Sequence, residues 1–513
     1  MKLVDALDSK SSGSDTVSVR FRPWAPIKPI RIDVMCQFFF YKQYVIIQTM
    51  KKEVLIPIFL LAITSCAPAI DSSFSSSAID SSFSLSTNNQ SSDSSSTLPA
   101  FVTKELRNPE SLSHDYSRDD TNEVGYVGFK NKMLVFSHKI SETFVKNGYV
   151  SGENIVISPL SIQLCLGLAV RCADGQTRQE ILDVFDMNYE TFNQYYKLFY
   201  NENIFSATTN TGDLMAEQIL SNSIWFDNDI LLLDDGLDAL KNDYYCYSFK
   251  TDFNNNNRQA NQDITDFIEK NTNGILKPDL ELSTSTLFTL INTLYLKDVW
   301  NKAGSNLTEA PTSYKFKNSN GLTSQKQLLY GSYVSGRAFQ TNDYSSFYSD
   351  TQSGYRIYYI KANEGKNLKD LFNKETLSNV LDTTNYERIN EEKMEMYETR
   401  CIFPEYSVYS DIDLKNMFIE DFHVQSLFSL KTCNFSNIID GNVYCDTFKQ
   451  IAKLDVDKKG IRGAAVTYMA YSGAPSNPYT QVKEDFVVNQ EFGFVLTKKG
   501  SVLFSGVVTN IDK

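Results

Sequence analysis

The C-terminal part of the sequence alternates between short apolar strands and one long segment that fits no regular element. Residues 451–456 alternate apolar and polar positions as a half-buried strand does, and residues 486–488, 492–496 and 502–508 predict further short strands. The segment between them, residues 458–485, is too long for a hairpin turn and contains two prolines. Loops of more than about 12–15 residues in compact domains are usually functional or disordered. We therefore expect this loop to carry the function.

The first half of that loop has a composition that suits the interior of a sheet. The run Gly463-Ala-Ala-Val-Thr467 is small and uncharged, so it could enter a β-sheet without steric conflict. An exposed loop that can later become a buried strand stores energy in the folded state. The alternative is a flexible surface connection that is merely rich in alanine.

Helical and strand patterns also mark the start of the folded region. Residues 133–145 show helical spacing. Asn154–Ile162 reads as a short strand that runs into a helix, with Ser158 as the N-cap and Pro159 in the first turn. A further helix is expected over residues 178–185, after a turn that follows Ala173.

Composition and charge narrow the class of protein. With 513 residues and 13% aromatic content, the chain is long enough for one large globular domain with extensions. Its net charge of −13 argues against a nucleic-acid partner, which needs basic patches. The chain has only three histidines, which limits most hydrolytic and metal chemistry. No cysteine or histidine pair has zinc-finger spacing, and we expect no cofactor and no metal.

Four segments follow one another along the chain. Residues 1–49 are net basic, and we interpret them as an over-extended gene start or a disordered arm. Residues 50–66 are expected to be a signal peptide. Residues 67–123 are a serine-rich flexible linker and lead-in. Residues 124–513 are expected to form the folded domain.

Residues 50–66 have the order of an export signal. Two lysines precede the apolar run Val54–Ile63, which contains a proline and is too short to cross a bilayer. The run ends in Ile63-Thr-Ser-Cys66, which resembles the bacterial lipobox, whose cysteine is acylated and becomes the new N-terminus. We expect either a lipoprotein anchored at the cell surface through Cys66 or ordinary cleaved export to the extracellular space.

The folded region resembles the serpin family through a series of motifs in the family's order. The motifs are Asn154-Ile-Val-Ile-Ser-Pro-Leu-Ser-Ile162 with Ala173-Asp-Gly-Gln-Thr177, Ser221-Asn-Ser-Ile-Trp225, Ala260-Asn-Gln-Asp-Ile264 with Thr272-Asn-Gly-Ile275, Leu290-Ile-Asn-Thr-Leu-Tyr-Leu-Lys-Asp-Val-Trp300, Phe403-Pro-Glu-Tyr406 with Asp413-Leu414, and Phe492 to Val508. Each motif alone is weak, but their order is informative. The resemblance implies an α+β serpin fold with three β-sheets, about nine helices and an exposed reactive loop near the C-terminus.

The resemblance also implies a function. Serpins are not enzymes; they inhibit serine proteases, and some inhibit cysteine proteases, as suicide substrates. The protease attacks the reactive loop with its own nucleophile and forms an acyl-enzyme. The cut loop then enters the central sheet as an extra strand, and the trapped protease is distorted. We expect a monomer that meets its target protease outside the cell and reaches a membrane only through a lipid anchor.

Two other functions remain open. The first is a non-inhibitory serpin that acts as a binding or chaperone-like module. The second is a surface hydrolase that depends on His138 or His423. Both histidines have apolar neighbours in the sequence, which favours structural roles.

By the register of the family, Gly460 falls on the hinge glycine of the reactive loop. Side chains alternate in a strand, so every second residue would face inward after insertion. The inward residues would be Ile461, Gly463, Ala465 and Thr467. The outward residues would be Arg462, Ala464, Val466 and Tyr468. Arg462 would thus stay in water, and no charge would be buried.

The hinge departs from the family pattern in three ways. Lys458 and Lys459 replace the acidic residues that usually precede the hinge glycine, and Ile461 is larger than the usual Thr or Ser. Gln450 takes the place of a buried histidine. The residues that fall on positions governing the opening of the central sheet are Ser158, Asn292, Trp300 and Gln450.

The scissile bond stays open between several positions. Family spacing from the hinge glycine indicates Ala474, which is followed by Pro475. The bonds Tyr471-Ser472 and Tyr479-Thr480 are alternatives. No Lys or Arg lies between Arg462 and Lys483, so a chymotrypsin-like or elastase-like target is favoured over a trypsin-like one.

Two cysteine pairs were considered for disulfide bonds. Cys165 and Cys172 lie on one face of a predicted helix, about 10 Å apart along its axis, which is too far for a bridge. Cys433 and Cys445 could pair in an oxidising compartment.

Overall fold

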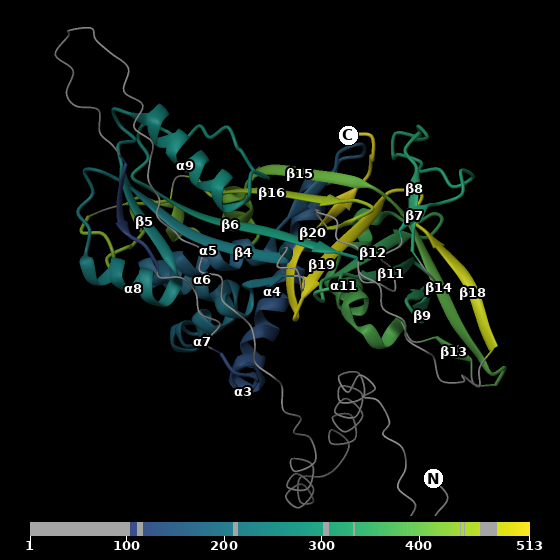
Figure 1. Ribbon diagram of the computed structural model, residues 1–513. Coiled ribbons are helices and arrows are strands. Elements are labelled where there is room, and N and C mark those ends of the chain that lie inside the picture. Colours follow the sequence, from purple (N-terminus) through teal and green to yellow (C-terminus); the bar gives the residue numbers. More distant parts are fainter. Residues whose placement is uncertain are drawn as a thin grey trace, which may run out of the picture. The chain divides into compact units, whose positions relative to one another are not determined.

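The computed structural model describes residues 103–109, 116–208, 214–300, 307–331, 334–386, 388–390, 392–441, 443–445, 447–461 and 480–513. Within these ranges the chain forms ten α-helices and three β-sheets, which confirms the expected α+β architecture (Figure 1). The expected gene-start extension, signal peptide and acylation site at Cys66 lie outside the described residues and stay predictions.

The helices gather mainly in the first half of the domain. They are α3 (Arg118–Asn122), α4 (Val124–Gly148), α5 (Pro159–Cys172), α6 (Gly175–Val184), α7 (Tyr189–Glu202), α8 (Asp234–Tyr244), α9 (Asn257–Asn271), α10 (Leu368–Leu371), α11 (Lys374–Leu381) and α12 (Lys415–Glu420), with the 3-10 helices η2 (Thr383–Tyr386) and η3 (Ser426–Phe428). The expected start of α5 is confirmed, because Ser158 accepts a hydrogen bond from the Ser161 amide and Pro159 is the first helical residue. The expected helix at 178–185 begins earlier, at Gly175, since Asp174 already has extended N-cap geometry.

The largest sheet is the central one, and its long strands run between the helices α5 and α9 (Figure 1). In spatial order its strands are β1 (Lys104–Arg107), β5 (Cys246–Thr251), β4 (Leu214–Asp227), β6 (Phe288–Val299), β17 (Gly460–Ile461), β16 (Lys449–Val456) and β15 (Tyr406–Asp413), with β3 (Phe205–Thr208) paired to β4. The edge strand β1 comes from the lead-in, and Arg107 forms ion pairs with Asp234 and Asp238 of α8.

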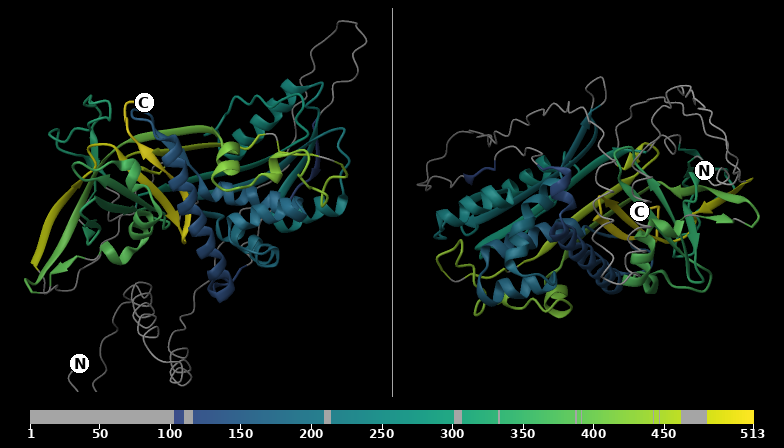
Figure 2. Two further views of the ribbon diagram at one scale, coloured as in Figure 1. Left: turned by 180° about the vertical axis from the view of Figure 1, so that it is seen from behind. Right: turned by 90° about the horizontal axis from the view of Figure 1, so that it is seen from below.

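The second and third sheets lie beside the central sheet. The second contains β10 (Ala338–Gln340), β11 (Tyr344–Asp350), β12 (Arg356–Ala362), β19 (Phe492–Lys498), β20 (Ser501–Val508) and β2 (Ile155–Ile157). The third contains β13 (Ile389–Asn390), β14 (Glu395–Pro404), β8 (Leu328–Tyr330), β7 (Thr308–Glu309), β18 (Thr480–Val487) and β9 (Val334–Ser335). The parallel pair β14–β18 extends as a long ribbon, which is visible from behind in Figure 2.

Apolar packing fixes the central sheet from both faces. On one face α5 is almost entirely buried and packs against β6 and β20. On the other face lies α9 (Figure 1). It covers a smaller cluster, in which the Trp225 and Phe249 rings stack 4.1 Å apart and Phe267 meets them edge-on. Burial of aromatic surface of this size is a main source of stability. Among the described residues, no helix combines the length and the apolar character that a bilayer span needs.

His138 is a buried histidine between α4 and α11. Its Nδ1 lies 3.4 Å from Ser378 Oγ, and its Nε2 has no hydrogen-bond partner among the described residues. Burial, with a smaller contribution from Lys374, lowers the pKa of His138 to about 4. The ring is therefore neutral in the folded protein at mildly acidic pH, whereas it takes up a proton on unfolding.

We expect the folded state to lose stability as the pH falls from about 6.5 to about 4, because only the unfolded chain binds a proton at His138 in that window. The loss should approach about 3 kcal/mol, measured as denaturation midpoints at a series of pH values. His138→Asn should flatten this part of the profile, while His423→Asn, at an exposed position, should leave it unchanged. If the stability of the wild type and of His138→Asn fell equally steeply with falling pH, the loss of stability could not be assigned to His138.

Candidate functional site

The sequence predicted the hinge of a functional loop at Gly460, and the structure places this residue in the middle of the central sheet. Gly460 and Ile461 form β17, which pairs antiparallel with Val299 and Asp298 of β6 on one side and with Val456 of β16 on the other. Ile461 is fully buried. The described part of the chain therefore reaches Ile461 between two inner strands of the sheet.

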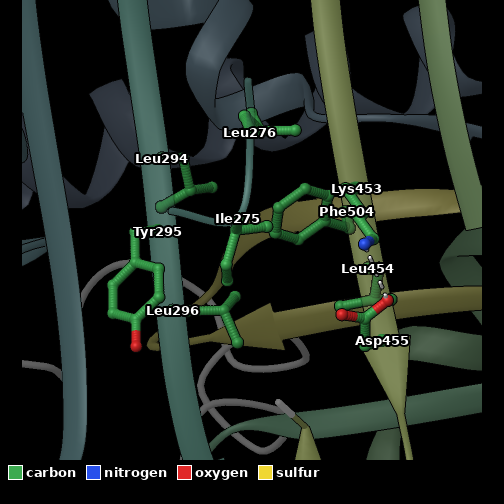
Figure 3. A pocket seen from close by; sticks show the side chains of 9 residues that line it. All are labelled: Ile275, Leu276, Leu294, Tyr295, Leu296, Lys453, Leu454, Asp455 and Phe504. Atoms are coloured by element: carbon green, nitrogen blue, oxygen red, sulfur yellow. Dashed lines mark ion pairs between the residues drawn. The ribbon is translucent and has the colours of Figure 1, made fainter. Parts of the chain in front are cut away.

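Beyond β17 the sheet is incomplete. No ladder joins β6 to β16 within the described residues, because β17 alone connects them. A cavity lies between the two strands, as Figure 3 shows. Its lining consists of Leu294, Tyr295 and Leu296 of β6, Lys453, Leu454 and Asp455 of β16, and Ile275, Leu276 and Phe504. The gap between β6 and β16 is thus a mainly apolar site at the position of a missing strand.

A network of hydrogen bonds around Trp300 fixes the turn that leads into β17. Trp300 Nε1 donates to the Asp457 carbonyl at 2.8 Å, and its backbone amide donates to the Lys459 carbonyl at 3.3 Å. The Asp457 carboxylate accepts from the amides of Lys459 and Gly460, at 2.6 and 3.1 Å. Trp300 is 2% exposed and packs edge-on against Phe403. The turn is therefore tied to the end of β6.

Only glycine fits at position 460. A Cβ atom there would lie 2.1 Å from the Asp298 carbonyl oxygen and 2.8 Å from the Val299 Cα atom. Both contacts are with backbone, which cannot rotate away as a side chain can. The residue type that the sequence offered as a flexible hinge is thus also required by close packing against β6.

Two polar pairs hold the strands on either side of the gap. Gln450 of β16 accepts from the Ser158 amide at 2.9 Å and donates to the Ser158 carbonyl at 2.8 Å. Asn292 of β6 donates to Asn222 Oδ1 of β4 at 2.8 Å, and Asn222 donates in turn to the Tyr244 carbonyl at 2.8 Å. The residues predicted to govern the opening of the central sheet therefore lie on both sides of the gap. Gln450 and Ser158 lie on the side of β16, and Asn292 lies on β6.

Asp298 is a residue that sequence reasoning missed. Its side chain is fully buried beneath the hinge, and its carboxylate accepts from the Val299 amide and from both the amide and hydroxyl of Ser353. Burial raises the pKa of this carboxyl group. Nearby, the ammonium of Lys498 lies over the rings of Phe205 and Tyr355, and burial lowers its pKa to about 7. The sequence around Asp298 carries no local signal for this role, because its burial depends on the contact with Ser353.

The far end of the loop joins the third sheet. Thr480, one of the candidate scissile residues, is the first residue of β18, which pairs in parallel with β14. The guanidinium of Arg400 donates two hydrogen bonds to Asp485, at 2.9 and 2.6 Å, and Arg388 pairs with Glu484. The remaining hinge residues, Arg462, Gly463, Ala464, Ala465, Val466 and Thr467, and the candidate scissile residues Tyr471, Ser472, Ala474, Pro475 and Tyr479, lie outside the described residues.

The arrangement around His138 lacks the features of a hydrolytic centre. Ser378 Oγ, which lies next to this ring, donates to the Lys374 carbonyl at 2.7 Å. His138 Nε2 meets no carboxylate in the described part of the chain that could orient the ring as a base. The described residues also contain no cluster of His, Cys, Asp and Glu side chains suited to a metal ion.

Solved structures share this fold. Serpin48 from the insect Tenebrio molitor superposes with a TM-score of 0.60 at 19% identity and covers 77% of this chain and 99% of its own. The thermophilic serpin tengpin, in its native state, superposes with a TM-score of 0.62 at 19% identity and covers 80% of this chain and 99% of its own.

Sequence comparison leads to the same family. Human serpin B3 is 24% identical over 384 residues, which are 69% of this chain and 93% of the relative, and human neuroserpin is 24% identical over 373 residues, which are 69% and 86%. The family model of the serpins, described as serine protease inhibitors, matches residues 132–511. The chain therefore belongs to the serpin family.

Proposed function

We propose that this serpin inhibits a serine protease, or a cysteine protease, by trapping it after the protease has cut the loop between Ile461 and Thr480. The observation that supports the proposal is the position of β17, which bridges β6 and β16 at one end of a gap that no other described strand occupies. The loop would continue from Ile461 into this gap. After Arg462, the run from Gly463 to Thr467 is small and uncharged, which would let it fit between the two strands.

Strand insertion would gain backbone hydrogen bonds on both sides. Since β17 is antiparallel to β6 and to β16, a continuation of β17 would be antiparallel to both neighbours. The strand edges that face the gap would then be paired rather than left open. The inward side chains at 463, 465 and 467 would lie against the lining of the gap between β6 and β16, while Arg462 would face the opposite way.

The protease would supply the nucleophile and the other catalytic groups. Its nucleophile attacks the scissile carbonyl, the peptide bond breaks, and the new amino terminus leaves while the loop stays attached as an acyl group. If insertion is faster than attack by water, the acyl-enzyme is carried away from the cut end and distorted. This chain would have to supply only the loop and the gap between β6 and β16.

The favoured target is a chymotrypsin-like or elastase-like protease outside the cell. Tyr471, Ala474 and Tyr479 are the candidate residues before the cut, and no basic residue lies between Arg462 and Lys483. An exported protein, either secreted or anchored through Cys66, would meet such a protease as a monomer. A non-inhibitory serpin is the alternative that the next experiment separates from the proposal.

Incubation with chymotrypsin and with elastase should yield a covalent complex that survives SDS, together with cleaved protein of raised stability. The new hydrogen bonds of an inserted strand should raise the melting temperature by about 20 °C. Electrophoresis and thermal melts of the intact and cleaved protein measure both effects. Clean cleavage with an unchanged melting temperature would support the non-inhibitory alternative instead.

Ala465→Arg should abolish trapping, because an inward arginine would have to enter the gap between β6 and β16 as an unpaired charge. We expect the yield of covalent complex to fall at least about tenfold, while cleavage of the loop continues. Ala464→Arg is the matched control, since position 464 would face outward, and it should keep nearly the full yield. Equal yields from the two variants would refute the proposed register.

Gln450→Leu should destabilise the folded state, because it leaves the buried Ser158 amide without its partner and the Ser158 carbonyl with only the Ile162 amide. The expected loss is about 1–3 kcal/mol, measured as a lower denaturation midpoint. Gln262→Leu, which removes an exposed hydrogen bond to Asp266 on α9, should change stability by less than about 0.5 kcal/mol. Equal denaturation midpoints for the two variants would mean that the hydrogen bonds between Gln450 and Ser158 do not stabilise the folded state.

A further inference from the structure

The segment between η3 and β16 contains two cysteines that differ from the others. Cys433 and Cys445 are half-buried, whereas the other described cysteines, Cys165, Cys172, Cys246 and Cys401, are buried. All six are thiols in the structure. Both half-buried cysteines also pack against the main core.

The backbone brings these two cysteines together. The Cys433 amide donates to the Ser429 carbonyl at 2.8 Å, and the Cys445 amide donates to the Leu427 carbonyl at 2.9 Å. The two acceptors are two residues apart at the end of η3. The backbone amide of Cys445 also lies close enough to the Cys433 thiol to oppose part of the rise in its pKa that burial causes. The two cysteines are thus neighbours in the fold.

The Cys445 side chain points elsewhere in this thiol form. Its Sγ donates to the Thr447 carbonyl at 3.3 Å. A bond to Cys433 would therefore require the Cys445 sulfur to leave the Thr447 carbonyl.

We propose that Cys433 and Cys445 form a disulfide bond when the protein is exposed to an oxidising thiol–disulfide buffer. The thiolate of one cysteine attacks glutathione disulfide, which gives a mixed disulfide and releases one glutathione thiolate. The second cysteine then displaces the other glutathione, so that two S–H bonds are replaced by one S–S bond. Glutathione disulfide takes up the two electrons and becomes two molecules of glutathione.

Burial raises the pKa of the Cys433 thiol to about 12, so in the folded thiol form this cysteine rarely supplies a thiolate. The bond therefore forms fastest while the segment is still folding and both sulfurs are accessible. The same burial protects the finished bond from reductants.

The disulfide would close a ring that spans two parts of the fold. Ring residues bond to the β4–α8 connection, where the Leu233 amide donates to the Ile438 carbonyl and the Asp440 amide donates to the Leu231 carbonyl, both at 3.0 Å. On the other side, the ring leads directly into β16. Closing the ring lowers the entropy of the unfolded chain, so the disulfide form should be the more heat-stable form.

The first test is peptide mapping of the full chain after it has been unfolded, reduced and refolded in a buffer with oxidised glutathione. Trypsin releases residues 432–449 as one peptide that contains both cysteines and no internal Lys or Arg. With the disulfide, this peptide is two hydrogens lighter and takes up iodoacetamide only after reduction. The control Cys445→Ser should leave Cys433 open to alkylation or to a mixed disulfide with glutathione. Alkylation of both cysteines in unreduced wild type would overturn the proposal.

The second test is thermal and needs no protease, so it is independent of the proposed inhibitory function. Reduction of the oxidised protein should lower its melting temperature by about 3–6 °C. The double variant Cys433→Ser/Cys445→Ser should melt at the same temperature with and without reductant, even though its other cysteines remain. If reductant lowered the melting temperature of the double variant as much as that of the wild type, the change would come from other cysteines, and the proposal would be wrong.

Discussion

The two hydrogen bonds that Trp300 donates fix the turn between β16 and β17, and the arrangement of the central sheet depends on this turn. They hold the carbonyls of Asp457 and Lys459, so the chain turns at the end of β16 and enters the sheet beside β6. Because β17 contains only two residues, the strands on either side are joined at one end and lack a ladder along the rest of their described length. Among the described residues, the edges of β6 and β16 that face each other beyond β17 are therefore unpaired, which is unfavourable compared with a completed sheet.

The other polar contacts near the gap between β6 and β16 keep its two sides in place. Gln450 ties β16 to the N-terminus of α5, and Asn292 ties β6 to β4. Asp298 anchors the end of β6 to Ser353 from below. Gln450 and Asp298 are buried and Asn292 is half-buried, so these hydrogen bonds also prevent the cost of leaving a polar group unsatisfied. The strands are thus held apart by specific contacts rather than by poor packing.

The sequence predicted the elements whose signals are local. The cap at Ser158 and the C-terminal strands have patterns of their own, and the structure contains them. The strand β18 was expected only from residue 486, but it begins at Thr480. Its charged residues Glu484 and Asp485 broke the apolar pattern, and they are accommodated because arginines outside β18 pair with them.

The position of the site could be predicted from the sequence, but the contacts between distant segments that build it could not. Gly460 and Gln450 could be named from a family pattern, whereas the close approach of Gly460 to Asp298 depends on a contact between distant segments. The importance of Asp298 itself had no local signal, since it becomes buried only when Ser353 and the end of β6 meet. The gap between β6 and β16 likewise reflects how three strands are arranged, which no single stretch of sequence encodes.

The strand β1 has a consequence for the solubility of this protein. It covers the outer edge of β5, and its charged residues Lys104, Glu105 and Arg107 occupy an edge that would otherwise offer open backbone groups to a neighbouring molecule. A chain that lost its lead-in up to this point would expose the β5 edge. The short lead-in therefore shields the protein from edge-to-edge aggregation, a hazard to which a protein with an incomplete sheet is especially open.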